Sequence, residues 1–173
     1  MMNKIVIITG PPGSGKSTIS QKLAERFSHG AVINVDKVRH MVKAGYVKPW
    51  VRSAKAQKQK MLGIKNACDL ANNFSKLGFY VFIDDVITEK DSFELYKKLF
   101  ENKMKVFLLL PLKDVLIKRD LSRNKEEIMG KRAIELWETF NYIKKEFEWD
   151  IIDSSYLSVN EVVDIINDKL KNS

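Results

Sequence analysis

Short runs of consecutive apolar residues recur along this chain, and longer stretches with helical spacing of apolar positions separate them. Apolar runs of about five positions, rich in β-branched residues, are typical of strands buried on both faces of a parallel sheet. Five such strands are predicted, at Lys4–Thr9, Ala31–Val35, Tyr80–Asp84, Lys105–Leu110 and Trp149–Asp153. Their alternation with helices predicts an α/β fold, a three-layer α/β/α arrangement around a five-stranded parallel sheet.

The segments between these strands carry apolar residues three and four positions apart, as on one face of a helix. In the first segment, Ile19, Leu23 and Phe27 have this spacing. Gly78 follows the third helical pattern and Pro111 precedes the fifth, where residues that end and begin helices are expected. The predicted helices are Ser17–Ser28, Lys37–Ala44, Ser53–Leu77, Asp91–Asn102, Leu112–Ser122, Glu126–Phe147 and Val159–Lys171.

The turn between the first strand and the first helix carries the clearest chemical signal. Its sequence is Gly10-Pro11-Pro12-Gly13-Ser14-Gly15-Lys16-Ser17, followed by Thr18. This fits G-x-x-x-x-G-K-[ST], a phosphate-binding loop (P-loop) whose glycines let backbone N–H groups surround phosphate oxygens. In this pattern Lys16 reaches the β- and γ-phosphates and Ser17 binds Mg²⁺. The sequence therefore predicts a site for a nucleoside triphosphate and Mg²⁺ at the start of a helix.

Other polar residues follow the remaining strands, where ligands bind in open parallel sheets. Asp36 ends the second predicted strand and faces the expected position of the γ-phosphate. Transfer of a phosphoryl group to an alcohol requires a group that positions the acceptor hydroxyl and accepts its proton, and Asp36 is the candidate base. The alternative is that Asp36 is a helix N-cap, a position that Asp favours; the two roles are compatible.

Two adjacent carboxylates, Asp84 and Asp85, end the third predicted strand. They resemble the second acidic element of P-loop proteins, which orders Mg²⁺ and its waters. Adjacent residues of a strand point to opposite faces, so the two are not expected to share one role. We favour Asp84 for the metal and Asp85 for a contact with the acceptor or with groups around it, although little in the sequence separates them.

Cationic residues follow the fourth strand, and a polar segment follows the fifth. Arg119 and Arg123 are four positions apart and share one helix face. A short segment over residues 119–133 resembles a lid that brings positive charge to the triphosphate, with Arg119 and Arg123 as catalytic and nucleotide-binding residues. Ser154 and Ser155 lie where the nucleotide base is expected to rest against backbone.

Composition favours one globular domain. The chain has 173 residues, 45% of them apolar and 30% charged, which suits a single domain over 1–173. No apolar run approaches the length of about 18 residues needed to span a membrane. The first strand begins within a few residues of the start, which leaves no room for a signal peptide. We therefore expect a cytoplasmic protein with no membrane association.

The positive charge is concentrated in one segment. Residues 37–68 hold nine Lys and Arg and no Asp or Glu, whereas the formal net charge of the chain is +8. Such a run is often a solvated helix face, but this one directly follows the second strand. We expect residues 37–77 to form a helical segment that binds the acceptor, with Arg39, Trp50 and Arg52 as substrate-binding residues beside Asp36 and Asp85.

With these residues in view, the chain resembles the small P-loop kinases, nucleoside-kinase-like proteins that include chloramphenicol phosphotransferase, shikimate and gluconate kinases and polynucleotide 5′-hydroxyl kinases. The similarity lies in the Gly10–Ser17 loop, Val35-Asp36, Ile83-Asp84-Asp85-Val86 and Ile152-Asp153-Ser154-Ser155. The resemblance implies ATP as donor, Asp36 as acceptor contact and base, and Arg119 and Arg123 on the ATP side. Shikimate kinases have three glycines where this chain has Asp84-Asp85-Val86, which argues against shikimate.

Three functions are compatible with this pattern. The first is a Mg·ATP-dependent kinase that transfers the γ-phosphate to a hydroxyl of a small, anionic molecule. The second is a 5′-hydroxyl polynucleotide kinase, for which the basic segment and the Asp36-x-x-Arg39 pattern offer contacts to single-stranded nucleic acid. The third is a switch module that binds and hydrolyses ATP without an acceptor, against which stands the placement of Asp36.

Overall fold

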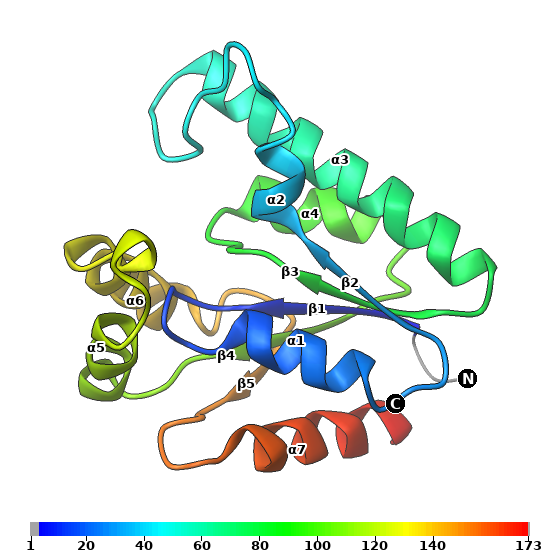
Figure 1. The fold of residues 1–173 in the computed structure, drawn as a ribbon. Coiled ribbons are helices and arrows are strands. Elements are labelled where there is room, and N and C mark those ends of the chain that lie inside the picture. The colour runs from blue at the N-terminus through cyan, green and yellow to red at the C-terminus, as the bar shows by residue number, and fades with distance from the viewer. Residues whose placement is uncertain (1–3, 173) are drawn as a thin grey trace.

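The computed structural model describes residues 4–172; residues 1–3 and 173, at the ends of the predicted domain, lie outside the described residues. Five parallel strands form one sheet with the order β2-β3-β1-β4-β5. Their bounds are β1 Ile5–Thr9, β2 Gly30–Asn34, β3 Tyr80–Asp84, β4 Lys105–Leu109 and β5 Asp150–Ile152. The predicted five-stranded parallel sheet is confirmed, with helices on both faces (Figure 1).

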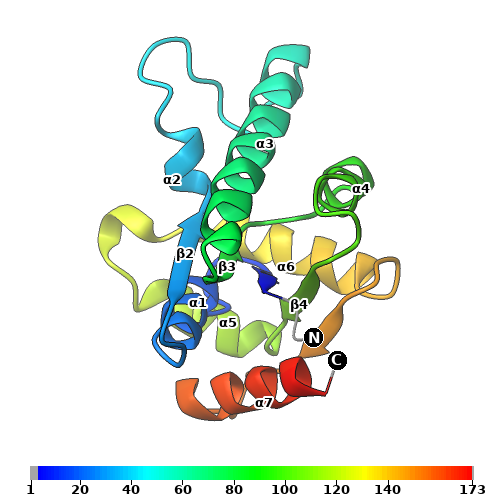
Figure 2. The same cartoon turned by 90° about the vertical axis from the view of Figure 1, so that its right-hand side faces the viewer.

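Seven α-helices and one 3₁₀ turn connect the strands within the described residues. They are α1 Lys16–Ala24, α2 Val35–Arg39, α3 Ala54–Lys76, α4 Lys90–Leu99, α5 Lys113–Leu121, η1 Lys125–Glu127, α6 Lys131–Ile143 and α7 Val159–Lys171. Figures 1 and 2 show α3 and α7 on opposite sides of the sheet. None of the helices in residues 4–172 combines the length and the apolar character that crossing a membrane requires.

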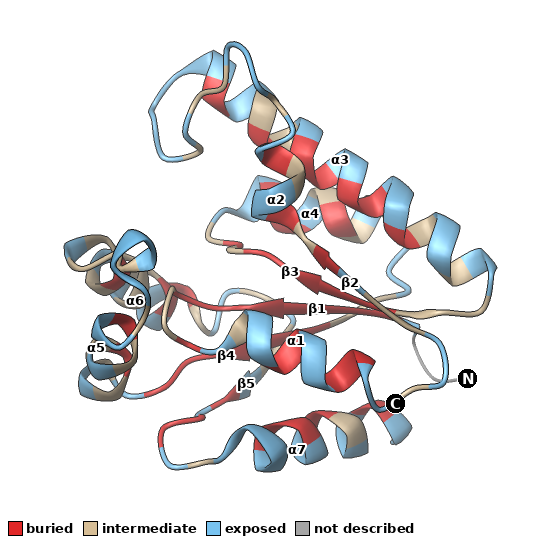
Figure 3. Cartoon of the chain, viewed as in Figure 1, coloured by how far each residue is buried: buried red, intermediate tan, exposed pale blue. Residues whose placement is uncertain are grey.

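Alternate residues of each strand enter two separate cores, as the period of a strand requires. On one face, Ile7 and Ile83 pack with Ile64 of α3 and Phe93 of α4. The opposite face of the sheet packs against α1 and α7 through residues such as Val6, Phe82, Leu23 and Ile166. Figure 3 shows β1 buried along its whole length, and β3 and β4 are buried at every residue after their first. The uninterrupted apolar runs of the sequence therefore reflect burial on both sides.

Two predicted helices differ from the structure. The helix expected at Lys37–Ala44 is α2, which ends at Arg39, five residues before the predicted end. It starts earlier than predicted because Asn34, one residue before it, accepts a hydrogen bond from Lys37 N at 2.9 Å and acts as the N-cap. The helix N-cap is thus Asn34 and not Asp36. The helix expected at Glu126–Phe147 is divided, with α6 beginning only at Lys131 after Gly130, whose φ of 52° is left-handed.

Candidate active site

The carboxyl ends of the strands meet at one edge of the sheet, together with the P-loop, the start of α2 and the segment that links α5 to α6 (Figure 1). A cavity of about 690 Å³ opens here. This volume is in the range of sites for small molecules and cofactors. It is lined by residues of the P-loop and α1, of the strand ends, of α5 and the segment that follows it, and by apolar residues of α7, among them Gly13, Lys16, Asp36, Asp84, Arg119, Arg123, Val159 and Val162.

The P-loop adopts a backbone path that only glycine permits at its first position. Gly10 has a φ of 145°, and a Cβ atom there would lie 2.3 Å from the carbonyl oxygen of Leu109 on β4. Gly13 and Gly15 also have left-handed φ values, of 82° and 95°. Because no side chain intervenes, the loop is free to curl tightly before α1 and present its N–H groups to an anion. This cradle fits the phosphates of a nucleotide.

Lys16 is the cation of this loop. Its ammonium donates to the carbonyl oxygen of Pro11 at 3.1 Å and lines the cavity. Burial lowers the pKa of Lys16 from its ordinary value, and the nearby carboxylates of Asp84 and Asp36 oppose the shift. A phosphate placed in the cavity would add negative charge beside this ammonium and favour its charged form.

Ser17 and Asp84 form an oxygen pair at the bottom of the site. The Ser17 hydroxyl donates to Asp84 Oδ2 at 2.5 Å, and the same oxygen accepts from Asn34 Nδ2 at 2.8 Å. Mg²⁺ prefers oxygen ligands and is usually held by one or two protein groups together with phosphate oxygens and water. The donor set therefore fits Mg²⁺, and no group of three or more His, Cys, Asp or Glu within residues 4–172 offers an all-protein metal site.

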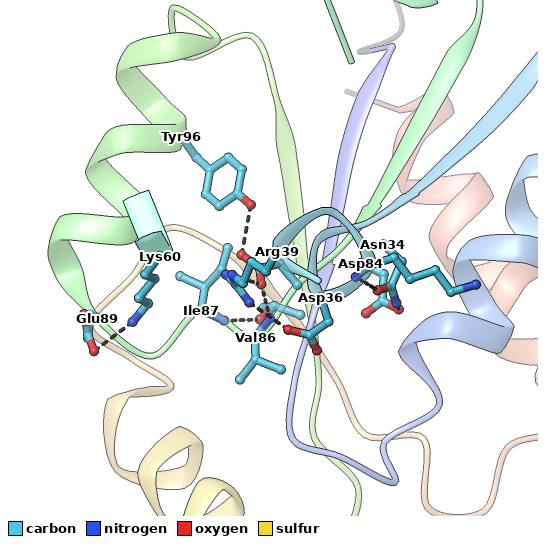
Figure 4. A network of polar contacts seen from close by, with 12 residues as sticks. Asn34, Asp36, Arg39, Lys60, Asp84, Val86, Ile87, Glu89 and Tyr96 are labelled. Carbon is cyan, nitrogen blue, oxygen red and sulfur yellow. Dashed lines mark hydrogen bonds and ion pairs between the residues drawn. The ribbon is translucent and has the colours of Figure 1, made fainter. Parts of the chain in front are cut away.

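The two adjacent acids at the end of β3, Asp84 and the Asp85 that follows the strand, have different partners, as predicted from strand geometry. Asp84 binds Ser17 of the P-loop, whereas Asp85 binds residues of α2 and α4. Figure 4 shows Asp84 beside Asn34 and away from Tyr96 of α4. Asp85 accepts from Arg39 Nη2 and from the hydroxyl of Tyr96, each at 2.9 Å. Its side chain is only 2% exposed. Asp85 and Arg39 were both predicted to contact substrate, but neither is among the described residues that line the cavity.

Asp36 keeps a position from which it can reach a ligand. It lies in the first turn of α2, lines the cavity and has a side chain that is 59% exposed. Its Oδ1 accepts from Arg39 Nη1 at 2.9 Å. One carboxylate oxygen is therefore tied to the protein, and the side chain as a whole is open to the cavity.

The two predicted arginines differ in what holds them. Arg119 lines the cavity and donates to the carbonyl oxygen of Ser154 at 2.8 Å and to its hydroxyl at 3.2 Å. Arg123 also lines the cavity, and it donates to the carbonyl oxygen of Glu127 at 2.7 Å. Ser154 lines the cavity as well, whereas the Ser155 hydroxyl donates to Asp153 and accepts from Leu112 N.

Trp50 and Arg52 lie in the connection between α2 and α3, and neither occurs among the described residues that line the cavity. The Trp50 ring is half-exposed, with Lys48 Nζ 5.4 Å and the Arg132 guanidinium 5.9 Å from its centroid. Arg132 belongs to α6, so this contact joins the predicted acceptor segment to the far side of the site. Thr18, predicted with the P-loop, does line the cavity.

The comparisons with known proteins agree with this geometry. Residues 6–138, more than half of the chain, match a family described as an AAA domain. The chain belongs to this family of P-loop kinases. An adenylate kinase from Sulfurisphaera tokodaii is 33% identical to this P-loop kinase over 159 residues, which cover 82% of this chain and 81% of that enzyme.

Two further proteins illustrate the range of relatives of this P-loop kinase. A tRNA dimethylallyltransferase from Leuconostoc mesenteroides is 33% identical over 92 residues, or 51% of this chain. The match covers only 29% of that enzyme. A gluconokinase structure from Sinorhizobium meliloti 1021 has a TM-score of 0.74 at 14% identity, covering 99% of this chain and 93% of that one. The predicted resemblance to small P-loop kinases is confirmed at the level of family and fold.

Several residues of the site were not predicted from the sequence of this P-loop kinase. Asn34 binds Asp84 and lines the cavity. An Asn at the end of a strand and directly before a helix is a sequence signal that could have identified it. Asp120 is 2% exposed and accepts from the backbone N–H groups of Met129 and Gly130, so it fixes the segment after Arg123. Tyr96 has no local signal, because its apolar neighbours make it look like an ordinary core residue of α4.

Proposed function

We propose that this P-loop kinase is a Mg·ATP-dependent phosphotransferase that transfers the γ-phosphate to a hydroxyl of a small, anionic molecule. The observation that carries the proposal is the placement of Asp36. A half-exposed carboxylate lines the same cavity as Lys16 and Ser17, although it is 20 positions from Lys16 in the chain and caps no helix. A protein that only bound nucleotide would have no need of a proton acceptor at this place, whereas hydrolysis would use one to activate water.

In the proposed reaction, the acceptor hydroxyl oxygen forms a bond to the γ-phosphorus while the bond to the β,γ-bridging oxygen breaks. The hydroxyl proton passes to the carboxylate of Asp36, and ADP leaves. Lys16 and the P-loop amides hold the phosphates, and Arg119 and Arg123 counter the negative charge from the opposite side of the cavity. Ser17 and Asp84 would hold Mg²⁺, which neutralises phosphate charge when bound.

The nucleotide base has a natural place at the end of the cavity formed by α7. Leu157, Val159 and Val162 supply apolar surface there, and Ser154 is fixed beside it through Arg119. ATP is the donor that the family resemblance implies. A competition assay with ATP and GTP at equal concentrations tests this part of the proposal, since preferential use of GTP would reverse it.

The surroundings of Asp36 support an anionic acceptor. Lys37, Lys48 and Arg52 are exposed in α2 and in the connection from α2 to α3, and Arg132 of α6 lies over the Trp50 ring of that connection. The names of the relatives support phosphotransfer to small molecules, since a gluconokinase shares the fold and an adenylate kinase is 33% identical. Adenylate accepts on a phosphate and gluconate carries hydroxyl groups, so the two differ in the group they offer.

The decisive experiment is an acceptor screen with γ-labelled ATP and Mg²⁺. The panel contains D-gluconate, shikimate, chloramphenicol, adenosine 5′-phosphosulfate, AMP and a 5′-hydroxyl oligonucleotide, with an acceptor-free control for hydrolysis. We expect label in a hydroxyl acceptor. Label only in AMP would change the acceptor class from hydroxyl to phosphate, and hydrolysis without transfer to any compound would favour the switch module.

The base assignment has its own test in the same assay. Asp36→Asn removes the proton acceptor and keeps nearly the same shape. We expect transfer to fall about 10²- to 10⁴-fold, the usual contribution of general base catalysis, while the Kd for Mg·ATP stays within about twofold. Undiminished transfer by Asp36→Asn would remove Asp36 as the base.

The basic segment at residues 37–68 keeps a polynucleotide 5′-hydroxyl kinase as a second candidate. Two of its nine cations form ion pairs with carboxylates: Arg39 pairs with Asp36 and Asp85, and Lys60 pairs with Glu89. The exposed ones remain available to phosphates. This candidate predicts affinity for single strands that falls steeply with salt, and a flat salt dependence would count against it.

A further inference from the structure

Arg39 lies at the centre of a buried polar chain that ends at the proposed base. Its two terminal nitrogens serve different acids: Nη1 donates to Asp36 Oδ1 and Nη2 donates to Asp85 Oδ1, both at 2.9 Å. The Arg39 side chain is only 6% exposed. The planar fork of a guanidinium thus joins one acid of the cavity wall to one acid of the core (Figure 4).

Asp85 is fixed at both of its oxygens. Oδ1 accepts from Arg39 and from the backbone N–H of Val86 at 2.9 Å, and Oδ2 accepts from the Tyr96 hydroxyl at 2.9 Å. Burial, reinforced by the charge of Asp85, raises the pKa of Tyr96 well above its ordinary value. The phenol therefore stays protonated and remains a donor. Three of the about four lone-pair positions of this carboxylate are thus occupied by groups of the protein, so Asp85 gives Arg39 a fixed anchor.

The position of Arg39 is also restricted by packing. A Cβ atom on Gly63 of α3 would lie 2.7 Å from Arg39 Cγ, so the arginine stem lies directly against this glycine. Burial alone would lower the pKa of Arg39, but the charges of Asp85 and Asp36 raise it above its ordinary value. Arg39 is thus a permanent cation, held by α2, α3 and β3 together. Its nitrogens lie behind Asp36, away from the described lining of the cavity.

We propose that Tyr96, Asp85 and Arg39 are positioning residues, which hold the Asp36 carboxylate by one oxygen so that the other faces the acceptor hydroxyl. This inference rests on the proposed function of Asp36 as base. It assigns Arg39 a role different from the substrate contact that the Asp36-x-x-Arg39 pattern suggests, and it gives the second acid of the pair a task that does not involve the metal.

The reaction rate should depend on the shape of the cation at position 39 and not only on its charge. Lysine at position 39 keeps the charge but has a single nitrogen on a flexible stem, so it cannot bridge two carboxylates in a fixed geometry. Asp85→Asn and Tyr96→Phe weaken the anchor while leaving the Arg39–Asp36 contact in place. A misplacement of the base by about 1 Å can reduce the rate about 100-fold.

The test is a double-mutant cycle. Arg39→Lys, Asp85→Asn and Tyr96→Phe are each made in the wild-type and in the Asp36→Asn background. For each protein, kcat, the KM for the panel compound phosphorylated fastest by the wild type, the Kd for Mg·ATP and the Tm are measured. Lys60→Gln is the matched control, because Lys60 is an equally buried cation of α3 whose partner at 2.8 Å is Glu89 and not Asp36.

We expect Arg39→Lys to lower kcat about 100-fold and Tyr96→Phe about five- to tenfold, with acceptor KM and ATP Kd within twofold. In the Asp36→Asn background the same substitutions should change kcat less than twofold, because no base remains to be positioned. Lys60→Gln should leave kcat within twofold in both backgrounds. Tyr96→Phe keeps the test valid if Arg39→Lys does not fold.

Three results would overturn the proposal. Equal losses in both backgrounds would show a purely structural role, a raised acceptor KM at constant kcat would show that Arg39 binds substrate, and unchanged kcat in all three variants would show no role. The proposed function fails in a different way: the wild type would phosphorylate no panel compound, or Asp36→Asn would retain full transfer. The two failures are therefore distinguishable.

Discussion

Under the proposed function, the two neighbouring acids at the end of β3 separate a nucleotide (donor) side of the site from an acceptor side. Asp84 faces the P-loop and touches Ser17, whereas Asp85 is enclosed by Arg39 and Tyr96. On the donor side, backbone groups and short local contacts form the phosphate cradle. On the acceptor side, buried side chains from distant parts of the chain hold a single exposed carboxylate. In this proposal the same residue type binds a ligand at one position and other residues of the protein at the next.

On the donor side, the largest effect is expected at Lys16. Lys16→Ala removes the cation of the P-loop, and loss of one donor aimed at developing charge costs about 10²- to 10³-fold in rate. We expect transfer and acceptor-free hydrolysis to fall together, because both use the same phosphates. Lys22→Ala is the control, since Lys22 lies on the same helix but pairs with Glu25 on the surface. A variant that lost transfer and kept hydrolysis would contradict the assignment of Lys16 to the donor side.

The donor side is also the part that the sequence predicts best. The pattern G-x-x-x-x-G-K-[ST] fixes the backbone path of the P-loop directly, and local spacing identifies Ser17, Asp84, Arg119 and Arg123, which all line the cavity. The strands followed from uninterrupted apolar runs because both faces of the sheet are covered. The acceptor side could not be predicted in this way, since Arg39 finds Asp85 across 46 positions of sequence.

Local side chains account for the helix boundaries that were predicted wrongly. The Asn34 side chain moves the start of α2 toward the N-terminus. The buried Asp120 side chain accepts a hydrogen bond from the backbone N–H of Gly130, directly before α6. Polar caps of this kind compete with helical periodicity over two or three residues. Apolar spacing alone does not reveal which of several nearby Asn and Asp residues takes the role.

On the acceptor side, we expect the next largest effect, a loss in the free energy of unfolding. Asp85→Ala leaves the Arg39 charge buried with one partner fewer and deprives the Tyr96 hydroxyl of its acceptor. Removal of one partner from a buried ion pair costs about 3–5 kcal/mol, and we expect about 3 kcal/mol because Asp36 still pairs with Arg39. Urea unfolding monitored by Trp fluorescence gives this free energy.

The matched control for that measurement is Glu25→Ala, which breaks the exposed pair with Lys22. Pairs of this kind contribute less than about 1 kcal/mol. If Asp85→Ala were no more destabilising than Glu25→Ala, the buried chain would not anchor the acceptor side, and the distinction between Asp84 and Asp85 would lose its structural basis.

Asp84→Asn tests the metal assignment and is expected to have a smaller effect. The amide retains an oxygen beside Ser17 but loses the charge that favours a divalent cation. We expect the Mg²⁺ concentration for half-maximal transfer to rise about 10- to 100-fold, with most activity restored at high Mg²⁺. Asp85→Asn should leave the Mg²⁺ dependence unchanged. The opposite outcome, with Asp85→Asn shifting it, would exchange the roles of the two acids.

The smallest effect is expected at Gly63, where local preference and tertiary packing oppose each other. Glycine inside a helix is about 1 kcal/mol less favourable than alanine, so Gly63→Ala should stabilise α3 in isolation. The added Cβ would lie 2.7 Å from Arg39 Cγ, however, and overpacking of a tight contact costs about 1–3 kcal/mol. We expect a net loss of about 1 kcal/mol in unfolding free energy and a reduced kcat, because Arg39 shifts and Asp36 with it. Asn66→Ala, on the exposed face of the same helix, measures the effect of helix propensity alone. An equal gain in unfolding free energy in both variants, with kcat unchanged, would show that Arg39 can move without affecting the base.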